Sequence, residues 1–325
     1  MLVVVALGGH AIAPRGVAID VATQRRNVHL AADALVRLAE VHDVVLTHGN
    51  GPQVGLLAAQ AQADPQAPVV PLDVLGAESD GMIGYILEAE LRRRLPERDI
   101  ATLLTQVEVG ADDPAFDRPE KPIGPVYGVD DELQANWSTV EVAPGKLRRV
   151  VASPQPTQIL ELAAIRKLVE SKILLICAGG GGIPVARASD GELRGVEAVV
   201  DKDLTSELLA EAIGADALLL LTDEPAVYTD WPEKREPIAQ ATASELRVLP
   251  LDPGSMGPKV EAACRFVEAT GRSAVIGALE DAHRMLSDGA GTRVRPEGLD
   301  RDLEPTSAAS TVSHSHHRND EGEPP

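Results

Sequence analysis

The chain has 325 residues, of which 44% are apolar, so it can form one large α/β domain or two smaller ones with a sizeable core. Aromatic residues make up only 2%, so Ala, Val, Leu and Ile must build that core. A net charge of −20 argues against a protein that binds nucleic acid along an extended surface, and no apolar run approaches the length of a membrane span.

Apolar runs alternate with helical patterns through the first third of the chain. The expected strands and helices are, in chain order, a strand at 2–7, a helix at 21–40, a strand at 43–48, helices at 51–63 and 72–95, and a strand at 101–109. Residues 111–150 are rich in Pro, Asp and Gly and break this alternation. They are interpreted as an insertion or small subdomain, which is either a lid or a long surface hairpin without a role.

The alternation resumes after residue 150. The next expected elements are a helix at 157–171, a strand at 173–178 that runs into four glycines, and, within 196–215, a short strand, an Asp-Lys-Asp turn and a helix. The last ones are a strand at 217–221, a helix within 254–271, and strands at 273–279 and 290–294. This pattern predicts a mostly parallel sheet covered by helices on both faces. It assigns residues 1–300 to the folded domain.

The end of the chain, residues 301–325, is polar and low in apolar residues, which predicts a disordered tail. Its histidines, His314, His316 and His317, are not expected to form a functional metal site. The two cysteines, Cys177 and Cys264, lie far apart without metal-type spacing, which is typical of reduced thiols in a cytoplasmic protein.

The stretch HGNGPQVG, residues 48–55, directly follows a strand and opens a helix. Such a turn presents backbone N–H groups and is suited to hold an anion. It lacks the Lys-Ser/Thr pair of a Walker loop, and its third glycine, Gly55, comes one residue too late for a dinucleotide fingerprint. The turn therefore predicts an anion site of another family.

Other unusual turns also follow strands, and in a parallel sheet ligands bind beyond the carboxyl ends of the strands. These turns are Gly8-Gly9-His10, Gly49-Asn50-Gly51, Gly179 to Gly182, and Thr222-Asp223. Arginine outnumbers lysine 23 to 7, yet Lys121, Lys202 and Lys259 lie in Gly-, Pro- or Asp-rich settings, where a compact point charge is useful. Together these features favour a phosphate-bearing ligand and phosphoryl transfer.

Nine segments in the expected order resemble carbamate kinase of the amino acid kinase superfamily, and the likeness covers residues 2 to about 294. They are LVVVALGGHA, LTHGNGPQVG, GMIGYIL, EKPIGPVY, RRVVASPQP, ICAGGGGIPV, GVEAVVDKDLTSELLA, LLTDEPAVY and PGSMGPKVEAACRFVEATG. The resemblance implies a three-layer α/β/α sandwich around one open, mainly parallel sheet, with a protruding subdomain at about 111–150, and a homodimer. It also implies the reversible reaction ATP + carbamate ⇌ ADP + carbamoyl phosphate with Mg²⁺, which usually runs toward ATP in arginine or similar catabolism.

The same resemblance assigns roles to residues. Lys202 contacts the transferred phosphoryl group, Asp203 orients the catalytic lysines, Lys259 contacts the nucleotide phosphates, and Lys121 reaches in from the subdomain. The implied substrate-binding residues are Gly8, Gly9, His10, Gly49, Asn50 and Gly51. The implied nucleotide-binding residues are Asp223, Tyr228, Ser255, Met256, Gly257 and Lys259. No protein side chain is expected to ligate a metal.

Two positions depart from the family pattern. His10 stands where the family usually has Asn, and TDEPAVY, residues 222–228, replaces a more acidic, glycine-containing version. Two alternatives therefore accompany an active carbamate kinase: a kinase of the same fold that acts on another small carboxylate or phosphonate, and a catalytically idle sensor of nucleotide or carbamoyl phosphate. Neither nucleic acid nor membrane is an expected partner.

Overall fold

The computed structural model describes residues 1–12, 20–62, 66, 68–129, 131, 137–230, 234–252, 254–287 and 289–298. The predicted tail at 301–325, with its three histidines, lies outside these ranges. Within them, no helix has both the length and the apolar character needed to cross a bilayer.

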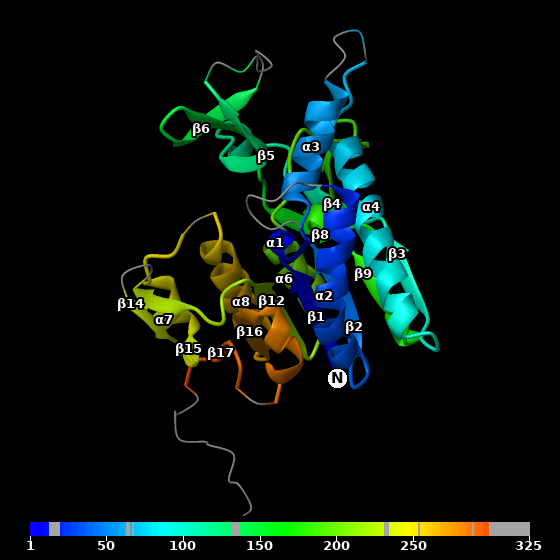
Figure 1. Ribbon diagram of the computed structural model, residues 1–325, viewed down its shortest axis with the longest axis vertical. Helices are drawn as coiled ribbons and strands as arrows, with labels where there is room; N and C mark the ends of the chain where they lie inside the picture. The colour runs from blue at the N-terminus through cyan, green and yellow to red at the C-terminus, as the bar shows by residue number, and fades with distance from the viewer. Residues whose placement is uncertain are drawn as a thin grey trace, which may run out of the picture.

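An eight-stranded sheet forms the centre of the molecule, in the order β15-β17-β16-β12-β1-β2-β9-β3 (Figure 1). Its strands are β1 (Leu2–Leu7), β2 (Asp43–His48), β3 (Ile100–Leu103), β9 (Leu174–Cys177), β12 (Ala217–Thr222), β15 (Gln240–Thr242), β16 (Ser273–Ala278) and β17 (Thr292–Arg295). All neighbouring pairs are parallel except β16 and β17. The predicted mainly parallel sheet is therefore confirmed.

Two apolar cores cover the two faces of this sheet. Along β1, Val3 and Val5 point into one core, whereas Val4 and Ala6 point into the other, as the two-residue repeat of a strand requires. The first core is closed by helices α2 (Val21–Ala39) and α4 (Leu72–Arg94) and by the 3₁₀ helix η3 (Leu279–Arg284). The second is closed by α5 (Leu162–Glu170), α6 (Lys202–Ala212), α7 (Ala243–Arg247) and α8 (Met256–Thr270).

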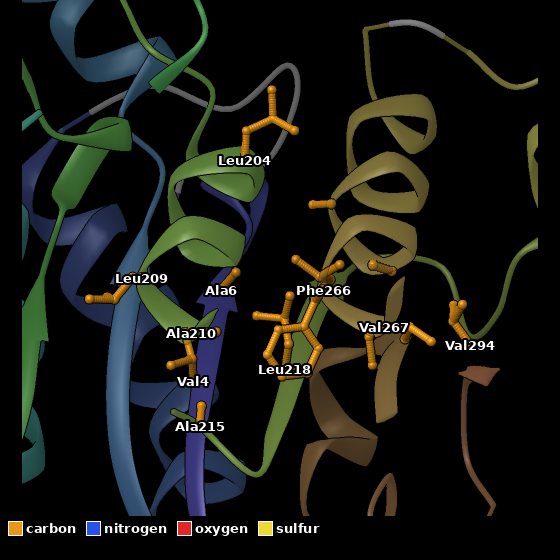
Figure 2. Packing of buried hydrophobic residues seen from close by; sticks show 14 of the residues in the cluster. Val4, Ala6, Leu204, Leu209, Ala210, Ala215, Leu218, Phe266, Val267 and Val294 are labelled. Carbon is orange, nitrogen blue, oxygen red and sulfur yellow. The ribbon is translucent and has the colours of Figure 1, made fainter. Parts of the chain in front are cut away.

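Figure 2 shows the second core from close by. Phe266 of α8 lies beside Leu218 of β12, and Leu209 projects from α6. Phe266 is the largest fully buried side chain of the described residues, and aliphatic side chains dominate the rest of this core. The three layers of helix, sheet and helix match the expected sandwich.

The predicted strand at 101–109 is wrong as a single element. It divides into β3, which belongs to the central sheet, and β4 (Gln106–Val109), which belongs to a second sheet in the order β11-β10-β4-β8. Thr105 lies at the break, where its hydroxyl donates to Leu103 O and accepts from Ala178 N. A contact with a residue 73 positions away thus ends the strand.

Three other expected elements also need correction. The first residues of the helix predicted at 157–171 form β8 (Pro156–Ile159), and the helix α5 begins after them. The chain after the four glycines forms another strand, β10 (Ile183–Arg187), which pairs with β11 (Leu193–Gly195). The short strand expected before the Asp-Lys-Asp turn is a single bridge between Ala198 and Ala152.

The segment at 111–150 contains a separate antiparallel sheet, which projects from the molecule beside α3 (Gly51–Ala61) (Figure 1). Its strands are β5 (Lys121–Gly128), β6 (Ser138–Ala143) and β7 (Lys146–Val151), in the order β5-β7-β6. It meets α3 backbone to backbone, because a Cβ on Gly55 would lie 1.9 Å from Gly124 Cα. Its movement as a lid stays a prediction.

The remaining short elements lie around these sheets. They are α1 (Gly9–Ile12), η1 (Pro114–Phe116), η2 (Gly179–Gly181), β13 (Tyr228–Asp230) and β14 (Lys234–Pro237).

Candidate active site

The carboxyl ends of the central strands bring the predicted turns together. Leu7 pairs with His48 at the ends of β1 and β2, so the turns that follow both strands start side by side. A Cβ on Gly49 would lie 3.1 Å from Gly9 N, and one on Gly180 would lie 2.1 Å from Asn50 Nδ2. The turns at Gly8-Gly9, Gly49-Asn50 and Gly179–Gly182 therefore share one edge of the sheet.

Three helices of eight or more residues begin at this edge. They are α3 after Asn50, α6 after Asp201 and α8 after Ser255. Asp201 caps α6, where its Oδ1 accepts from Asp203 N at 2.9 Å and Leu204 N at 3.5 Å. Asn50 and Ser255 make no side-chain cap. Two positive helix ends without a side-chain cap thus face the region where an anion is expected.

Two aspartates connect the three predicted lysines. Lys202 Nζ donates to Asp203 Oδ1 at 2.5 Å, and Lys259 Nζ donates to Asp203 Oδ2 at 2.8 Å. Lys121 Nζ donates to Asp201 Oδ2 at 3.0 Å and to Val200 O at 3.2 Å. The lysines come from β5, α6 and α8, so segments far apart in the sequence converge on one cluster.

Burial tunes the charges of this cluster. The pKa of Lys202 falls to about 8, because burial and the nearby Lys259 ammonium outweigh the attraction of Asp203. Burial opposes the charge of Lys259 as well, but Asp203 and Asp201 outweigh it and raise the pKa of that lysine. Three lysines against two aspartates leave a net positive charge in a protein of charge −20.

Asp201 stays ionised in this setting. Burial alone would raise the pKa of its carboxyl group, but the ammonium groups of Lys121 and Lys202 hold that pKa well below its usual range. The carboxylate can therefore cap α6 and hold Lys121 at the same time.

Hydroxyl groups that sequence reasoning missed fix the first turn of α6. Ser206 Oγ donates to Lys202 O at 2.5 Å and shares a 2.7 Å hydrogen bond with Thr47 Oγ1 of β2. Thr205 Oγ1 donates to Gly181 O at 2.8 Å. The available signal was the Thr-Ser pair that directly follows Asp-Lys-Asp-Leu, since polar residues inside a buried helix need partners.

The side-chain amide of Asn50, which was expected to donate to the substrate, contacts α4. It is buried, and its Nδ2 donates to Ser79 Oγ of α4 at 2.7 Å. Ser79 in turn donates to Gly76 O. The amide therefore anchors the turn to α4.

Another predicted substrate residue, His10, has its backbone in α1, and its side chain falls outside the described part of the structure. Gly8 precedes this helix, and a Cβ there would lie 3.1 Å from Leu221 O of β12. The first glycine turn is thus also packed against the strand that leads to Thr222-Asp223.

The predicted nucleotide-binding residues lie around the end of β12 and the start of α8. Asp223 is exposed and accepts from Thr222 Oγ1 at 3.0 Å, and Tyr228 begins β13. Ser255, Met256 and Gly257 form the start of α8, one turn before Lys259. Gly257 N donates to Asp252 O at 2.8 Å, which folds the preceding loop back on the helix.

In the ranges that the structure describes, no three His, Cys, Asp or Glu side chains gather in a way that could hold a metal ion. Both oxygens of Asp203 are engaged by lysines, and those of Asp201 by Lys121 and the cap of α6. The central carboxylates therefore serve to place cations of the protein.

Comparison with known proteins adds to this geometry. Residues 1–278 match the model of the amino acid kinase family. A carbamate kinase of Rhizobium meliloti is 51% identical over 90% of this chain and 92% of its own length, and one of Haemophilus influenzae is 45% identical over 92% and 99%. The structure of carbamate kinase from Giardia lamblia bound to AMP-PNP superposes with a TM-score of 0.82 at 36% identity, covering 91% of this chain and 98% of that one.

Proposed function

This chain belongs to the amino acid kinase family and is a carbamate kinase, and on that premise we propose how its residues carry out ATP + carbamate ⇌ ADP + carbamoyl phosphate. The observation that carries the proposal is the cluster in which Asp203 holds Lys202 and Lys259 while Asp201 holds Lys121. Phosphoryl transfer needs mainly positioning and charge neutralisation, and fixed ammonium groups provide both.

In the direction that forms ATP, a β-phosphate oxygen of ADP attacks the phosphorus of carbamoyl phosphate. The bond between phosphorus and the carboxyl oxygen breaks, and carbamate leaves as an anion, so no proton has to be transferred. Backbone N–H groups of Gly8, Gly9, Asn50 and Gly51 hold the carbamate end, whereas the N–H of Gly49, expected to share this role, already donates to Leu7 O at 3.1 Å. Lys202, which lies against Gly49, neutralises the transferred phosphoryl group.

Lys259 contacts the phosphates of the nucleotide, since it lies in the first turns of α8, whose uncapped N-terminus favours an anion. Asp223, Tyr228, Ser255, Met256 and Gly257 line the rest of the nucleotide site. Lys121 comes from the projecting sheet, and it reaches the phosphoryl group from the side of the cluster where it contacts Asp201.

Mg²⁺ would be held by the phosphates of the nucleotide. The engagement of Asp201 and Asp203 by lysines and by a helix cap fits a metal bound mostly by substrate oxygens and water, which is a common mode for Mg²⁺. The metal would neutralise phosphate charge where the lysines do not.

The physiological direction toward ATP, a cytoplasmic location, a role in arginine catabolism and a homodimer are further parts of this proposal. The direction, the catabolic role and the dimer are supported by the sequence resemblance described above, and the cytoplasmic location by the two cysteines without metal-type spacing. Light scattering of the purified protein tests the dimer, since a monomer would be 34.3 kDa.

The test of the reaction is ATP formation from ADP and carbamoyl phosphate with Mg²⁺, corrected for spontaneous breakdown of carbamoyl phosphate. Wild type and His10→Asn are measured side by side, because His10 is the departure nearest to the substrate turns in sequence. Robust turnover by wild type supports the proposal. Turnover by His10→Asn alone would indicate another substrate, and inactivity of both with retained nucleotide binding would indicate a sensor.

A further inference from the structure

A histidine and an aspartate lie completely buried beneath the turn that is proposed to hold the carbamate end. His48 is the last residue of β2, and Asp80 lies in the middle of α4. His48 Nε2 lies 3.5 Å from Asp80 Oδ1, and His48 Nδ1 lies 3.2 Å from Gly49 O. The imidazole ring therefore lies between a buried carboxylate, which its Nε2 approaches without a hydrogen bond, and the backbone of the substrate turn.

The Asp80 carboxylate is otherwise poorly satisfied. Within the described residues neither of its oxygens has a hydrogen-bond partner, although its side chain is 0% exposed. An unsatisfied buried carboxylate is costly, so its presence calls for a reason other than stability. Nearby, Gly179 packs so closely that a Cβ there would lie 1.9 Å from Asp80 Oδ1 and 2.5 Å from His48 Nε2.

The contact with Gly49 O has a geometric consequence. A trans peptide is planar, and its C=O and N–H point in opposite directions. Because the buried His48 ring lies against Gly49 O, the N–H of Asn50 in the same peptide points away from that ring. The rotation of this peptide decides whether the turn offers a donor or an acceptor to an anion.

We propose that Asp80, acting through His48, is a positioning residue that keeps the Gly49-Asn50 peptide turned so that the Asn50 N–H meets the carboxyl end of carbamoyl phosphate. This inference rests on the proposed function. Asp80 does not touch the substrate. It orients the imidazole, and the imidazole fixes the peptide, in the way that a carboxylate behind a histidine fixes ligands elsewhere.

The neighbouring residue Ser79 supports the same turn by a different contact. Its hydroxyl accepts from Asn50 Nδ2, so two consecutive residues of α4 hold the side chain of Asn50 and the peptide before it. Gly180 packs against Asn50 in the way that Gly179 packs against Asp80. The four-glycine turn thus covers both contacts, which explains why it tolerates no side chain there.

The experiment compares wild type with Asp80→Asn in the ATP-forming assay. We expect the KM for carbamoyl phosphate to rise about fivefold or more and kcat to fall about tenfold, while the KM for ADP stays within about twofold. A merely structural role would lower the active fraction and leave both KM values at the wild-type level. Unchanged KM values, or an equal rise in both, would overturn the inference.

Two substitutions of His48 provide a second test that does not depend on Asp80→Asn. The amide nitrogen of Asn occupies the place of Nδ1, so His48→Asn should keep more activity on carbamoyl phosphate than His48→Gln, whose amide takes the place of Nε2. In the His48→Asn background, Asp80→Asn should have little further effect on either KM. Additive losses, or equal losses in the two His48 variants, would contradict action through His48.

Thr242→Ala is the matched control. Thr242 is a buried polar residue that caps α7 at the far edge of the sheet, so its loss lowers stability without reaching the substrate turn. Both KM values should stay at the wild-type level. Inactive wild type would overturn the proposed function together with this inference, whereas active wild type with unaltered Asp80→Asn would overturn this inference alone.

Discussion

Lys259 Nζ lies 2.8 Å from Asp203 Oδ2, and this ion pair joins the first turns of α8 and α6. The two side chains are only 9% and 5% exposed, so water competes little for their charges. The other oxygen of Asp203 holds Lys202. One carboxylate therefore sets the spacing of two cations before any ligand binds.

Asp203→Asn should abolish this arrangement. The neutral amide leaves two buried ammonium groups without their shared carboxylate, so we expect kcat to fall about 10²- to 10³-fold, as when a preorganised electrostatic group is removed. The melting temperature should fall too, because breaking a buried ion pair is strongly destabilising. Steady-state ATP formation and thermal unfolding measure the two effects.

Asp190→Asn is the control for that variant. Asp190 is exposed and pairs with Arg194 on the surface, where an ion pair contributes at most about 1 kcal/mol. The kcat and the melting temperature of the Asp190→Asn variant should match those of wild type. An Asp203→Asn enzyme with a kcat within twofold of wild type would show that the lysines do not depend on Asp203.

The low pKa of Lys202 predicts a pH dependence of the rate. Only the ammonium form neutralises phosphoryl charge, so kcat/KM should be full well below pH 8 and fall as the pH rises through that value. Removal of the neighbouring charge in Lys259→Met should raise the pKa of Lys202 and move the falling limb to higher pH. A pH profile of kcat/KM, which reports the free enzyme, checks both, and a profile flat from pH 7 to 10 would exclude Lys202 as the charged group.

Elements with continuous apolar runs could be predicted from the sequence. The strands at 2–7 and 43–48 match β1 and β2, because both lie inside the sheet with helices over each face. The break between β3 and β4 could not be predicted, because it depends on a contact of Thr105 with Ala178. No sequence pattern near Thr105 indicates a contact with a residue so far along the chain.

The candidate site was predictable to a similar extent. Lys121, Lys202 and Lys259 stand out in an arginine-rich chain, and the resemblance to carbamate kinases names them. The pair of His48 and Asp80 could not be found in this way. In the sequence, Asp80 is one polar residue inside a long helix. Only the packing of α4 against the ends of β2 and β9 shows that it faces His48.

The raised pKa of Glu207 predicts that the stability of the protein depends on pH. Burial, with help from Glu211 and Glu261 and against the effect of Arg265, raises the pKa of this α6 carboxyl group to about 7, from 4.5. The folded protein therefore binds a proton that the unfolded chain has released between these values. The free energy of unfolding should fall as the pH rises from about 4.5 to 7, by about 2–3 kcal/mol from this group.

Glu207→Gln removes that dependence. Denaturant unfolding at pH 5 and pH 8 should show a smaller difference between the two pH values for the variant than for wild type. Glu192→Gln, at an exposed position, should keep the wild-type difference. If the Glu207→Gln and wild-type differences are equal, Glu207 is ionised in the folded protein throughout this range.

Gly55→Ala tests whether the contact between α3 and β5 places Lys121. The added Cβ would lie 1.9 Å from Gly124 Cα and 2.1 Å from Gly124 N, which are backbone atoms that cannot turn aside. The projecting sheet must then shift, and Lys121, three residues before Gly124, should lose its 3.0 Å contact with Asp201. We expect kcat to fall about tenfold, because a misplaced charge stabilises the transition state less.

The matched control for Gly55→Ala is Gly76→Ala in α4. A Cβ there meets no heavy atom within 4 Å, and alanine favours a helix over glycine by about 1 kcal/mol. This variant should melt at or above the wild-type temperature and keep its kcat. A Gly55→Ala protein with wild-type kcat would mean that Lys121 reaches the phosphoryl group from a sheet that moves freely over α3, and that the contact between Gly55 and Gly124 serves packing alone.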